Sequence, residues 1–288
     1  MLGVNDRGLR ISVVTPNFNM GAYLPATIQS VLANLGPQDE YFIIDGGSSD
    51  GSVAAIEAYQ SRLTGWVSER DSGYAEAIGK GFARATGDIL CWINSGDLLL
   101  AGAFDRARQR LAEADAKFIF GDDFYIDEND CVLRYSCGKV ADIKTAMLYG
   151  GWTPLQDACF WRRDLYESVG GIDASVQYAA DYDLFLRMAM SGQTAYAPFA
   201  FSAFRRHKGQ KSIGGAERYA IDKEAARQRQ LPKLGSSLAA AAIKGFIEKN
   251  RMRVRARLAP RLWARPDLVG KPIASLACGS YWPPGQRA

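Results

Sequence analysis

The amino-acid sequence predicts an α/β fold in which a mostly parallel sheet is covered by helices on both faces. Apolar, β-branched runs alternate with stretches of helical spacing through the first hundred residues, an order typical of parallel strands joined by crossover helices. Hydrophobic residues make up 48% of the 288 residues, which is enough for a sizeable core. This composition excludes the disordered, collagen-like and coiled-coil classes.

The first hundred residues supply the regular part of this fold. The stretch Ala22–Ala33 places apolar residues three and four positions apart, which is the spacing of one helix face. The apolar run Tyr41–Asp45 ends in a Gly- and Ser-rich turn, as expected for a buried strand. We predict strands at Ile11–Thr15, Tyr41–Asp45, Trp66–Ser68 and Ile89–Ile93, and helices at Ala22–Ala33, Val53–Tyr59 and Tyr74–Ala85.

The alternation loosens after residue 97. Glu128-Asn129-Asp130 predicts a hairpin turn, and Gly170-Gly171 predicts a break between two helices. The remaining predictions are helices at Ala101–Ala114, Arg163–Val169 and Tyr182–Ser191, and extended segments at Lys117–Phe120, Phe124–Ile126 and Thr194–Phe204.

The charge distribution divides the chain in two. Residues 1–215 carry 20 Lys and Arg against 26 Asp and Glu, whereas residues 216–288 carry 15 against 5. We therefore predict a catalytic domain over 1–215 and a basic, largely helical extension over 216–288. An anionic membrane surface is one partner for such an extension. Its apolar residues at helical spacing are Ile243, Phe246, Ile247, Val254 and Leu258, flanked by Lys244, Lys249, Arg251, Arg255 and Arg257. Packing onto the catalytic domain or a second subunit is the open alternative.

Targeting signals and cysteine usage suggest where the protein works. No apolar run approaches the roughly 18 residues that a membrane span needs, and the first ten residues lack an apolar signal core. The five cysteines are widely spaced, which favours free thiols over a disulfide framework or a zinc site. We expect a cytoplasmic protein, peripheral at the inner face of the plasma membrane if the extension binds lipid, and no nucleic-acid partner.

Two common nucleotide-binding loops are excluded. The first predicted strand is followed by Thr15-Pro16-Asn17-Phe18-Asn19, which lacks the glycines of a dinucleotide-binding turn. The nearest approach to a P-loop, from Gly73 to Lys80, has the wrong spacing. What remains is a series of polar residues at the carboxyl ends of predicted strands, where open α/β sheets bind ligands.

These stretches, in their order, resemble glycosyltransferase family 2, whose members have the GT-A fold. The matching segments lie between about residues 10 and 212 and read VVTPNFN, IIDGGSSDGS, WVSERDSGYAEAIGKGFARATGDILCWINSGD, GDDFYIDEND, FWRRDLYESVGGID, AADYDLFLRMAMSGQ and FRRHKGQKS. The resemblance implies a GT-A-like sheet and transfer of a sugar from a nucleotide donor. The family's processive members carry a Q-x-x-R-W motif with transmembrane helices, and neither is found here, which favours a single addition.

The resemblance also implies a donor site. It places the nucleoside against Thr15, Pro16 and Asn17, with Asp45 accepting a hydrogen bond from the base. Asp45 could instead form the following turn. The other residues implied near the nucleotide sugar are Asp71, Lys80, Asn94 and Ser95; Asp71 could alternatively cap the next helix, and Lys80 could pair with Glu76.

A divalent metal ion, Mn²⁺ or Mg²⁺, is the cofactor that the resemblance implies. Asn94-Ser95-Gly96-Asp97 stands where the family has its acidic metal motif, and Gly96 departs from it, leaving Asp97 as the one carboxylate. His207, in a segment resembling the family's R-x-H, is the candidate further ligand. Asp97 could instead cap a helix and His207 could be structural. Arg205, Arg206, Lys208 and Lys211 could neutralise the donor phosphates.

Asp181, in Ala180-Asp181-Tyr182-Asp183, matches the family's catalytic base. An inverting transfer needs a carboxylate that takes the proton of the acceptor hydroxyl. Asp183 lies about 200° around a helix from Asp181, so we assign it to the scaffold.

The sequence therefore predicts an inverting, metal-dependent glycosyltransferase that uses a UDP-sugar and a lipid-linked or saccharide acceptor in bacterial surface polysaccharide or glycolipid assembly. The alternatives are a sugar-nucleotide nucleotidyltransferase and a catalytically degenerate sugar-nucleotide-binding module. Candidates without assigned roles on the acceptor side are Asp122, Asp123, Trp152 and Gln156.

Overall fold

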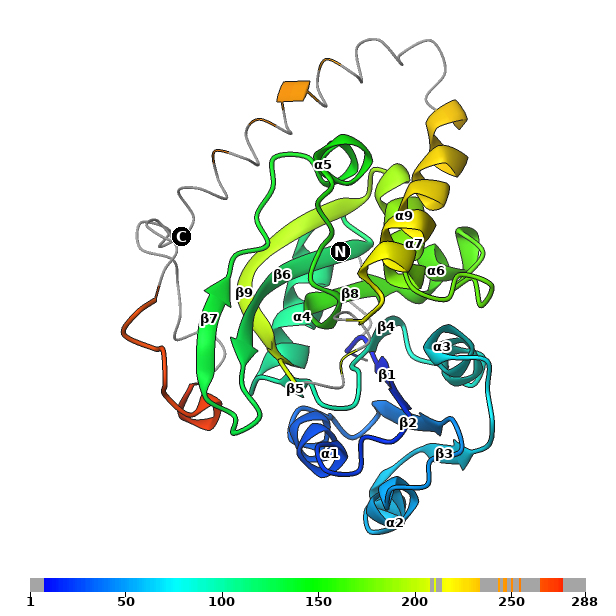
Figure 1. Ribbon diagram of the computed structural model, residues 1–288, viewed down its shortest axis with the longest axis vertical. Coiled ribbons are helices and arrows are strands. Elements are labelled where there is room, and N and C mark those ends of the chain that lie inside the picture. Colours follow the sequence, from blue (N-terminus) through cyan, green and yellow to red (C-terminus); the bar gives the residue numbers. More distant parts are fainter. Residues whose placement is uncertain are drawn as a thin grey trace, which may run out of the picture.

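A computed structural model of the chain contains one curled sheet with helices on both faces (Figure 1). It describes residues 8–207, 210, 214–233, 243, 246–247, 250, 254 and 265–276. The strands run in the order β3-β2-β1-β4-β8-β6-β9-β5, and β7 pairs with β6 beside this path. The predicted α/β class, with a mostly parallel sheet, is confirmed.

The amino-terminal half is a regular parallel unit. Strand β1 pairs with β2 and β4, and β2 pairs with β3, all in parallel. The elements are β1 (Ile11–Asn17), α1 (Leu24–Leu32), β2 (Glu40–Asp45), α2 (Ser52–Glu57), β3 (Gly65–Ser68), α3 (Tyr74–Phe82) and β4 (Ile89–Trp92). Every predicted strand and helix of this half is present, within a few residues of its predicted ends.

The second half is mixed, and here the sequence pattern missed several elements. Strand β8 (Cys159–Arg162) runs antiparallel between β4 and β6, while β6 (Phe118–Ile126) and β9 (Thr194–Arg205) are parallel. The two extended segments predicted at 117–126 form the single strand β6. The other elements are β5 (Leu98–Leu99), α4 (Ala103–Glu113), β7 (Val132–Ser136), α5 (Ile143–Gly150), α6 (Arg163–Ser168) and α7 (Ala180–Met190).

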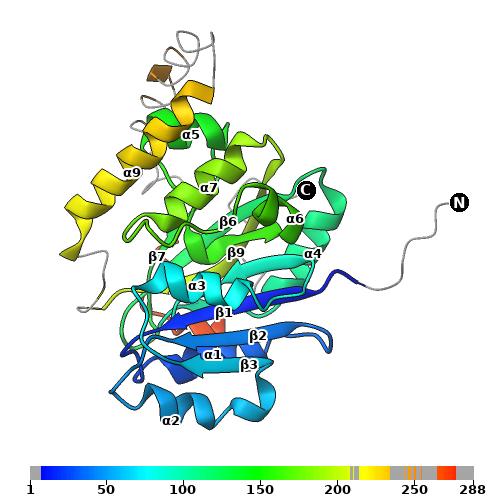
Figure 2. The same ribbon diagram turned by 90° about the vertical axis from the view of Figure 1, so that its right-hand side faces the viewer.

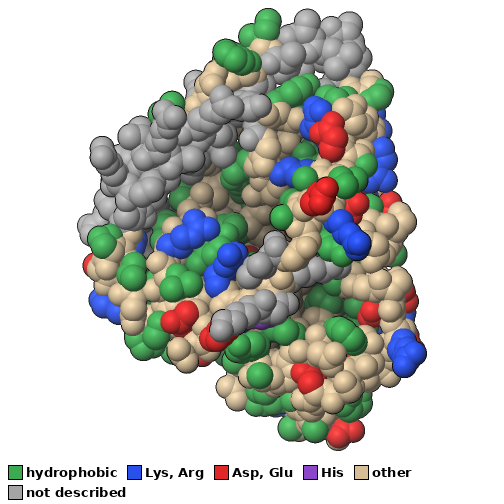
Figure 3. Space-filling view, in the orientation of Figure 1, with side chains coloured by type: hydrophobic (Ala, Val, Ile, Leu, Met, Phe, Trp, Pro, Cys, Tyr) green, Lys and Arg blue, Asp and Glu red, His purple; other side chains and the backbone are tan. Residues whose placement is uncertain are grey.

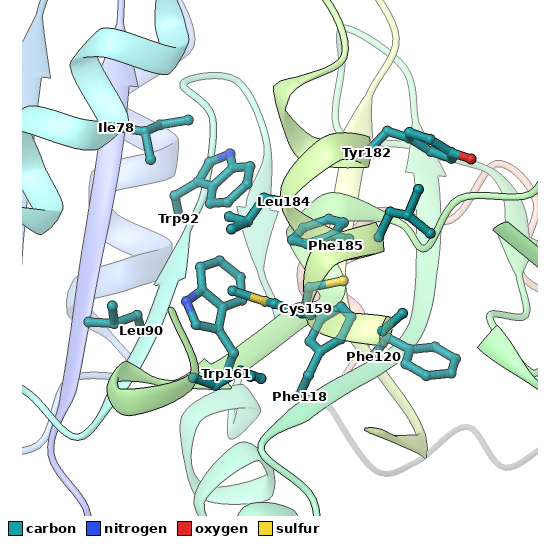
Figure 4. Close-up of a cluster of buried hydrophobic side chains, with 14 of the residues drawn as sticks. Ile78, Leu90, Trp92, Phe118, Phe120, Cys159, Trp161, Tyr182, Leu184 and Phe185 are labelled. Carbon is teal, nitrogen blue, oxygen red and sulfur yellow. The ribbon is translucent and has the colours of Figure 1, made fainter. Parts of the chain in front are cut away.

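Two apolar layers hold the helices on the sheet. On one face α3, α5, α6 and α7 pack on the sheet, and on the other α1, α2 and α4 (Figure 2). The first layer contains a cluster of aromatic rings, in which Trp92 stacks on Phe185 at 5.6 Å and meets Trp161 edge-on at 5.4 Å (Figure 4). Because Phe185 of α7 packs in this cluster, the contact with the sheet positions the first turns of α7 in space.

The described parts of the extension contact the rest of the protein at two places. Helix α9 (Ala216–Gln230) lies alongside α7, where Asp222 accepts a hydrogen bond from the backbone of Tyr178. Residues 265–276 pack on β6, β7 and β9 through Leu268, Ile273 and Leu276. The division of the chain at residue 215 stays a prediction.

The structure also bears on membrane spans, cysteines and the distribution of surface charge. In the part of the chain that the structure describes, no helix is long and apolar enough to cross a membrane. Cys91, Cys131, Cys137 and Cys159 are thiols that form no disulfide, as predicted, and Cys278 lies outside the described residues. Basic, acidic and apolar side chains are interspersed on the face seen in Figure 3.

Candidate active site

The loops after β1 and β2 are joined by a network of hydrogen bonds centred on Asp45. Asn17 and Asp45 are paired in register at the carboxyl ends of these parallel strands, and the Asn17 Nδ2 donates to Asp45 Oδ1 at 2.6 Å. Ser48 donates through its backbone and its hydroxyl, at 2.9 and 2.5 Å, and the Ser68 hydroxyl donates at 2.6 Å. Both carboxylate oxygens of Asp45 are thereby engaged.

Asp45 is held in place by contacts within the protein. Its side chain is fully buried, and burial alone would raise its pKa. The hydrogen bonds from Ser48, Ser68 and Asn17 outweigh burial and hold the pKa of Asp45 below its ordinary value. With its oxygens so occupied, Asp45 shapes the loop at 46–48, as in the turn-forming alternative, and its contact with a base stays a prediction.

Asn17 and Asp71 are two further polar residues beside Asp45. The Asn17 Oδ1 is buried and has no hydrogen-bond partner among the residues that are described. Asp71 is half-buried, and its Oδ1 accepts a hydrogen bond from the backbone N–H of Gly73 at 2.9 Å. Burial, with the nearby Glu76 and Asp45, raises the pKa of Asp71. Since a Cβ built on Gly46 would lie 3.0 Å from Asp71 Oδ2, the absence of a side chain there leaves this carboxylate its space.

Thr15, Pro16 and Lys80 serve the scaffold more than a ligand. Thr15 is fully buried with its hydroxyl paired to that of Tyr41 at 3.0 Å, and its contact with the nucleoside stays a prediction. The carbonyl of Pro16 accepts from the Ser95 hydroxyl at 3.2 Å. Lys80 pairs with Glu69 at 2.8 Å and with Glu76 at 2.9 Å, so the alternative of an ion pair on the helix surface is the one observed.

The loop after β4 owes its shape to Gly96. Its φ of +113° is a left-handed conformation that side chains disfavour, and an added Cβ would meet Met20 at 3.0 Å. Thr27 of α1 secures the turn by accepting from the Gly96 N–H at 2.9 Å and donating to the Asp97 carbonyl at 2.8 Å. The missing acid of the family's motif therefore has a local cause, since a carboxylate-bearing residue would be strained there.

Asp97 is buried under this loop. Its Oδ1 accepts from the backbone N–H of Arg205 at 2.9 Å, and burial together with the Asp157 carboxyl raises the pKa of Asp97 well above its ordinary value. Asp123 and Asp157 complete a group of three buried carboxyls, in which Ser202 donates to Asp123 at 3.2 Å. Asp157 and Asp123 had no signal in the sequence that would place them beside Asp97.

Arg205 holds this region together and is not free to bind phosphate. Its side chain is buried and donates to the carbonyls of Gly96 at 2.7 Å and Asp127 at 3.0 Å. It also forms an ion pair with Asp130. Arg206 is exposed, and Lys208 and Lys211 lie outside the described residues.

A metal ion would depend on ligands from the donor. Within residues 8–207 and the other described segments, no three His, Cys, Asp or Glu side chains are grouped closely enough to hold an ion. His207 packs against Tyr23 with 5.5 Å between ring centroids, and burial and the neighbouring Arg205 lower its pKa although Glu128 opposes them. A neutral imidazole and one carboxylate fit a divalent ion when phosphate oxygens and water fill the remaining positions.

Asp181 lies at the first turn of α7, beside the donor-side loop. Three residues after Asp71, Tyr74 accepts a hydrogen bond from the Ala180 N–H at 3.0 Å and donates to the Tyr178 carbonyl at 3.2 Å. Burial raises the pKa of Asp181 to about 6, although the Tyr182 N–H and Lys223 oppose it. Asp183 is paired with Arg187 at 2.7 Å and Arg229 at 3.0 Å, and this confirms its scaffold role.

Three of the four acceptor-side candidates, Gln156, Trp152 and Asp122, make contacts within the protein. Gln156 donates to the Trp92 carbonyl and accepts from the Asn94 side chain, both at 2.7 Å, so it fixes the end of β4 and the predicted donor residue Asn94. Trp152 packs on Phe120 at 5.7 Å. Asp122 accepts from Tyr135, Tyr196 and Gly138.

A family model and several protein relatives match this sequence. The model of glycosyl transferase family 2 matches residues 12–135. An uncharacterized glycosyltransferase of Mycobacterium tuberculosis is 29% identical over 187 residues, which cover 62% of this chain and 69% of that protein. A putative teichuronic acid biosynthesis glycosyltransferase of Bacillus subtilis is 29% identical over 113 residues, covering 38% and 45%. The chain is thus related to glycosyltransferases of surface polysaccharide assembly.

Solved structures share the fold at low identity. A mannosyltransferase of Pyrobaculum calidifontis, in complex with GDP-mannose and Mn²⁺, aligns with a TM-score of 0.60 and 17% identity over 91% of this chain and 82% of that chain. Residues 1–349 of Staphylococcus aureus TarS, in complex with UDP-GlcNAc, align with a TM-score of 0.55 and 13% identity over 88% and 78%. Against a longer TarS chain the alignment spans 41% of that chain. The predicted GT-A-like fold is confirmed.

Proposed function

We propose that the chain, which matches the glycosyl transferase family 2 model over residues 12–135, transfers a single sugar, with inversion, from a UDP-sugar to an acceptor hydroxyl. The observation that carries this proposal is a pair of hydrogen bonds, made by Tyr74, that joins the donor end of the site to the end that bears Asp181. Tyr74 connects the loop that bears Asp71 to the turn that bears Asp181. A donor bound at the Asp71 loop and an acceptor deprotonated by Asp181 would therefore be held side by side.

The donor end favours a base that offers an N–H group. The buried Asn17 Oδ1 is an acceptor without a partner among the described residues, and Asp71 supplies a second acceptor at the same edge. Uracil and guanine both present a ring N–H, and TarS residues 1–349 have been solved with UDP-GlcNAc. We place the nucleoside against Asn17 and Asp71, and the sugar near Asn94 and Ser95.

The proposed metal site combines two protein ligands with oxygens of the donor. Asp97 and His207 would hold Mn²⁺ or Mg²⁺ together with the donor diphosphate, and a bound ion would supply Lewis-acid stabilisation of the leaving group. The mannosyltransferase structure contains Mn²⁺ with its sugar nucleotide. The protein's own part is to fix Asp97 through Arg205 and the turn at Gly96.

Asp181 is the proposed base that takes the acceptor's proton. The Asp181→Asn variant should retain UDP affinity by calorimetry while its turnover falls by roughly 10²-fold, the usual scale for loss of a general base. The donor for this assay comes from a thermal-shift screen of nucleotide sugars, since a bound donor stabilises the fold. Asp173→Asn, which changes an exposed acid, is the matched control. Near-normal turnover in Asp181→Asn would remove Asp181 from the mechanism.

The extension supports a membrane-bound acceptor. Ile243, Phe246, Ile247 and Val254 are exposed, over 47% to 70% of their residue surface, which leaves apolar surface available to lipid. Leu258 and the flanking basic residues Lys244, Lys249, Arg251, Arg255 and Arg257 lie outside the described residues. We propose that this apolar stripe lies in an anionic membrane surface, near a lipid-linked acceptor.

A further inference from the structure

Helix α9 places a lysine against the turn that carries Asp181. Lys223 Nζ donates to the Gly151 carbonyl at 2.6 Å and to the Thr153 hydroxyl at 3.0 Å. It lies 4.6 Å from the ring centroid of Tyr182, the residue after Asp181. Lys223 thus joins three parts of the chain: α9, the segment 151–153 and the start of α7.

Each element packed around Asp181 presents groups of known charge. Helix α3 presents Tyr74 and β8 presents Cys159, and burial raises the pKa of both, so they stay neutral at physiological pH. From α9 come Tyr219, whose pKa burial also raises, and Lys223. Helix α5 meets this turn through the Met147 carbonyl, which accepts from the Tyr182 hydroxyl. Among the described groups that face Asp181, Lys223 alone carries a positive charge.

We propose that Lys223 is a positioning residue whose ammonium keeps Asp181 ionised and holds the segment 151–153 against the base. This inference rests on the proposed role of Asp181. A carboxyl group in surroundings of low polarity otherwise takes up a proton, and a protonated carboxyl cannot accept one from the acceptor hydroxyl. Lys223 lies beyond residues 12–135, so the family match does not supply this residue.

The protonation of the pair agrees with this arrangement. Burial raises the pKa of Asp181 to about 6, and the charge of Lys223 limits that rise. Burial lowers the pKa of Lys223 to about 8, and Asp181 limits that fall. Between these two values the pair is a carboxylate and an ammonium, which is the state that a general base requires.

Carbon-13 NMR titration of the Asp181 carboxyl in the full-length protein tests the proposal without any substrate. The resonance is assigned by its loss in Asp181→Asn. In Lys223→Met the titration midpoint should rise by about one pH unit, because the carboxylate loses its opposite charge. Lys223→Arg should return the midpoint toward that of the unmodified protein. Arg227→Met, which removes a cation one turn along α9 that pairs with Glu224, should leave the midpoint unchanged.

An unchanged midpoint in a folded Lys223→Met protein would overturn the proposal. Folding is checked by thermal unfolding, and Lys223→Gln, which keeps a hydrogen-bond donor, is the second variant and should shift the midpoint in the same direction. The outcome is separable from the fate of the proposed function. If Asp181→Asn retains normal turnover, Asp181 is not the base, yet the titration still reports whether Lys223 controls its charge.

Discussion

Asp157 and Asp183 are both buried, and their surroundings give them opposite effects on stability. Asp183 is paired with two arginines, whereas Asp157 has an oxygen with no partner among the described residues. Burial raises the pKa of Asp157 to about 6, so the folded protein binds more protons than the unfolded chain between about pH 4 and 6. The stability contributed by this group is therefore lost as pH rises through that window.

Asp157→Asn should raise the free energy of unfolding at pH 7.5 by about 1–2 kcal/mol, because it removes a carboxyl that must be charged while buried. Below about pH 4 the variant and the unmodified protein should have similar stability. Asp183→Asn is the matched comparison and should lower stability by about 3 kcal/mol, since it leaves half-buried Arg187 without its charged partner. Urea unfolding at both pH values measures these changes, and a less stable Asp157→Asn at pH 7.5 would contradict the assignment.

The metal ligands make a second prediction at this scale. Because no three protein ligands are grouped in the described part of the chain, Mn²⁺ should bind weakly alone and more tightly with UDP. Calorimetry of UDP with and without Mn²⁺ should show the enhancement, and both Asp97→Ala and His207→Ala should lose it. Asp173→Ala is the control. If His207→Ala keeps the full enhancement, the histidine only packs on Tyr23 and water completes the shell.

Individual residues also show which contacts could not be predicted from the sequence. The order of motifs was enough to place Asn17, Asp71 and Asp181 at one end of the sheet. It could not show that Asp45 accepts five hydrogen bonds. Two of the donors are the hydroxyls of Ser48 and Ser68, and no pattern in the sequence indicates where these hydroxyls point. Nor could it show that Arg205 is buried beneath Gly96, because that contact joins residues 109 positions apart.

At the scale of elements, the amino-terminal half was predictable because its strands are continuous apolar runs. Strand β8 was missed because its four residues, Cys-Phe-Trp-Arg, directly precede a helix and carry no alternation. Helix α5 was missed because it is only eight residues long and a glycine ends it. Strand β7 was missed although its hairpin turn was predicted, since two of its five residues are exposed.

The apolar stripe of the extension gives a prediction at the same scale. Replacing Ile243, Phe246 and Ile247 together by Ser should reduce co-sedimentation with anionic vesicles, because these exposed side chains are the proposed contact with lipid. Ile221→Ser, at an exposed apolar position of α9, is the control and should bind as before. This test is preferable to truncation at residue 215, which would also remove α9 from α7. Unchanged binding by the triple variant would reject the membrane role.

On the scale of the whole molecule, residues 265–276 stabilise the far end of the sheet. Leu268 and Ile273 are buried against β6, β7 and β9, and the Lys271 carbonyl accepts from the Val132 N–H at 2.9 Å. Leu268→Ala and Ile273→Ala should each lower the free energy of unfolding by about 2–3 kcal/mol, the usual cost of emptying a buried site. Val269→Ala, at an exposed neighbour, should change it little. Thermal unfolding measures all three, and equal effects would show that the segment is not packed as described.

This contact also constrains how the chain is made. Among the strands that the structure describes, β7 pairs with β6 alone, and its other edge is met by the backbone around Lys271. During translation that edge stays open until ~140 further residues have left the ribosome, roughly 7–30 s at 5–20 residues per second. An open strand edge is a template for pairing with other chains. Aggregation of the nascent chain should therefore depend on how fast the second half of the mRNA is translated.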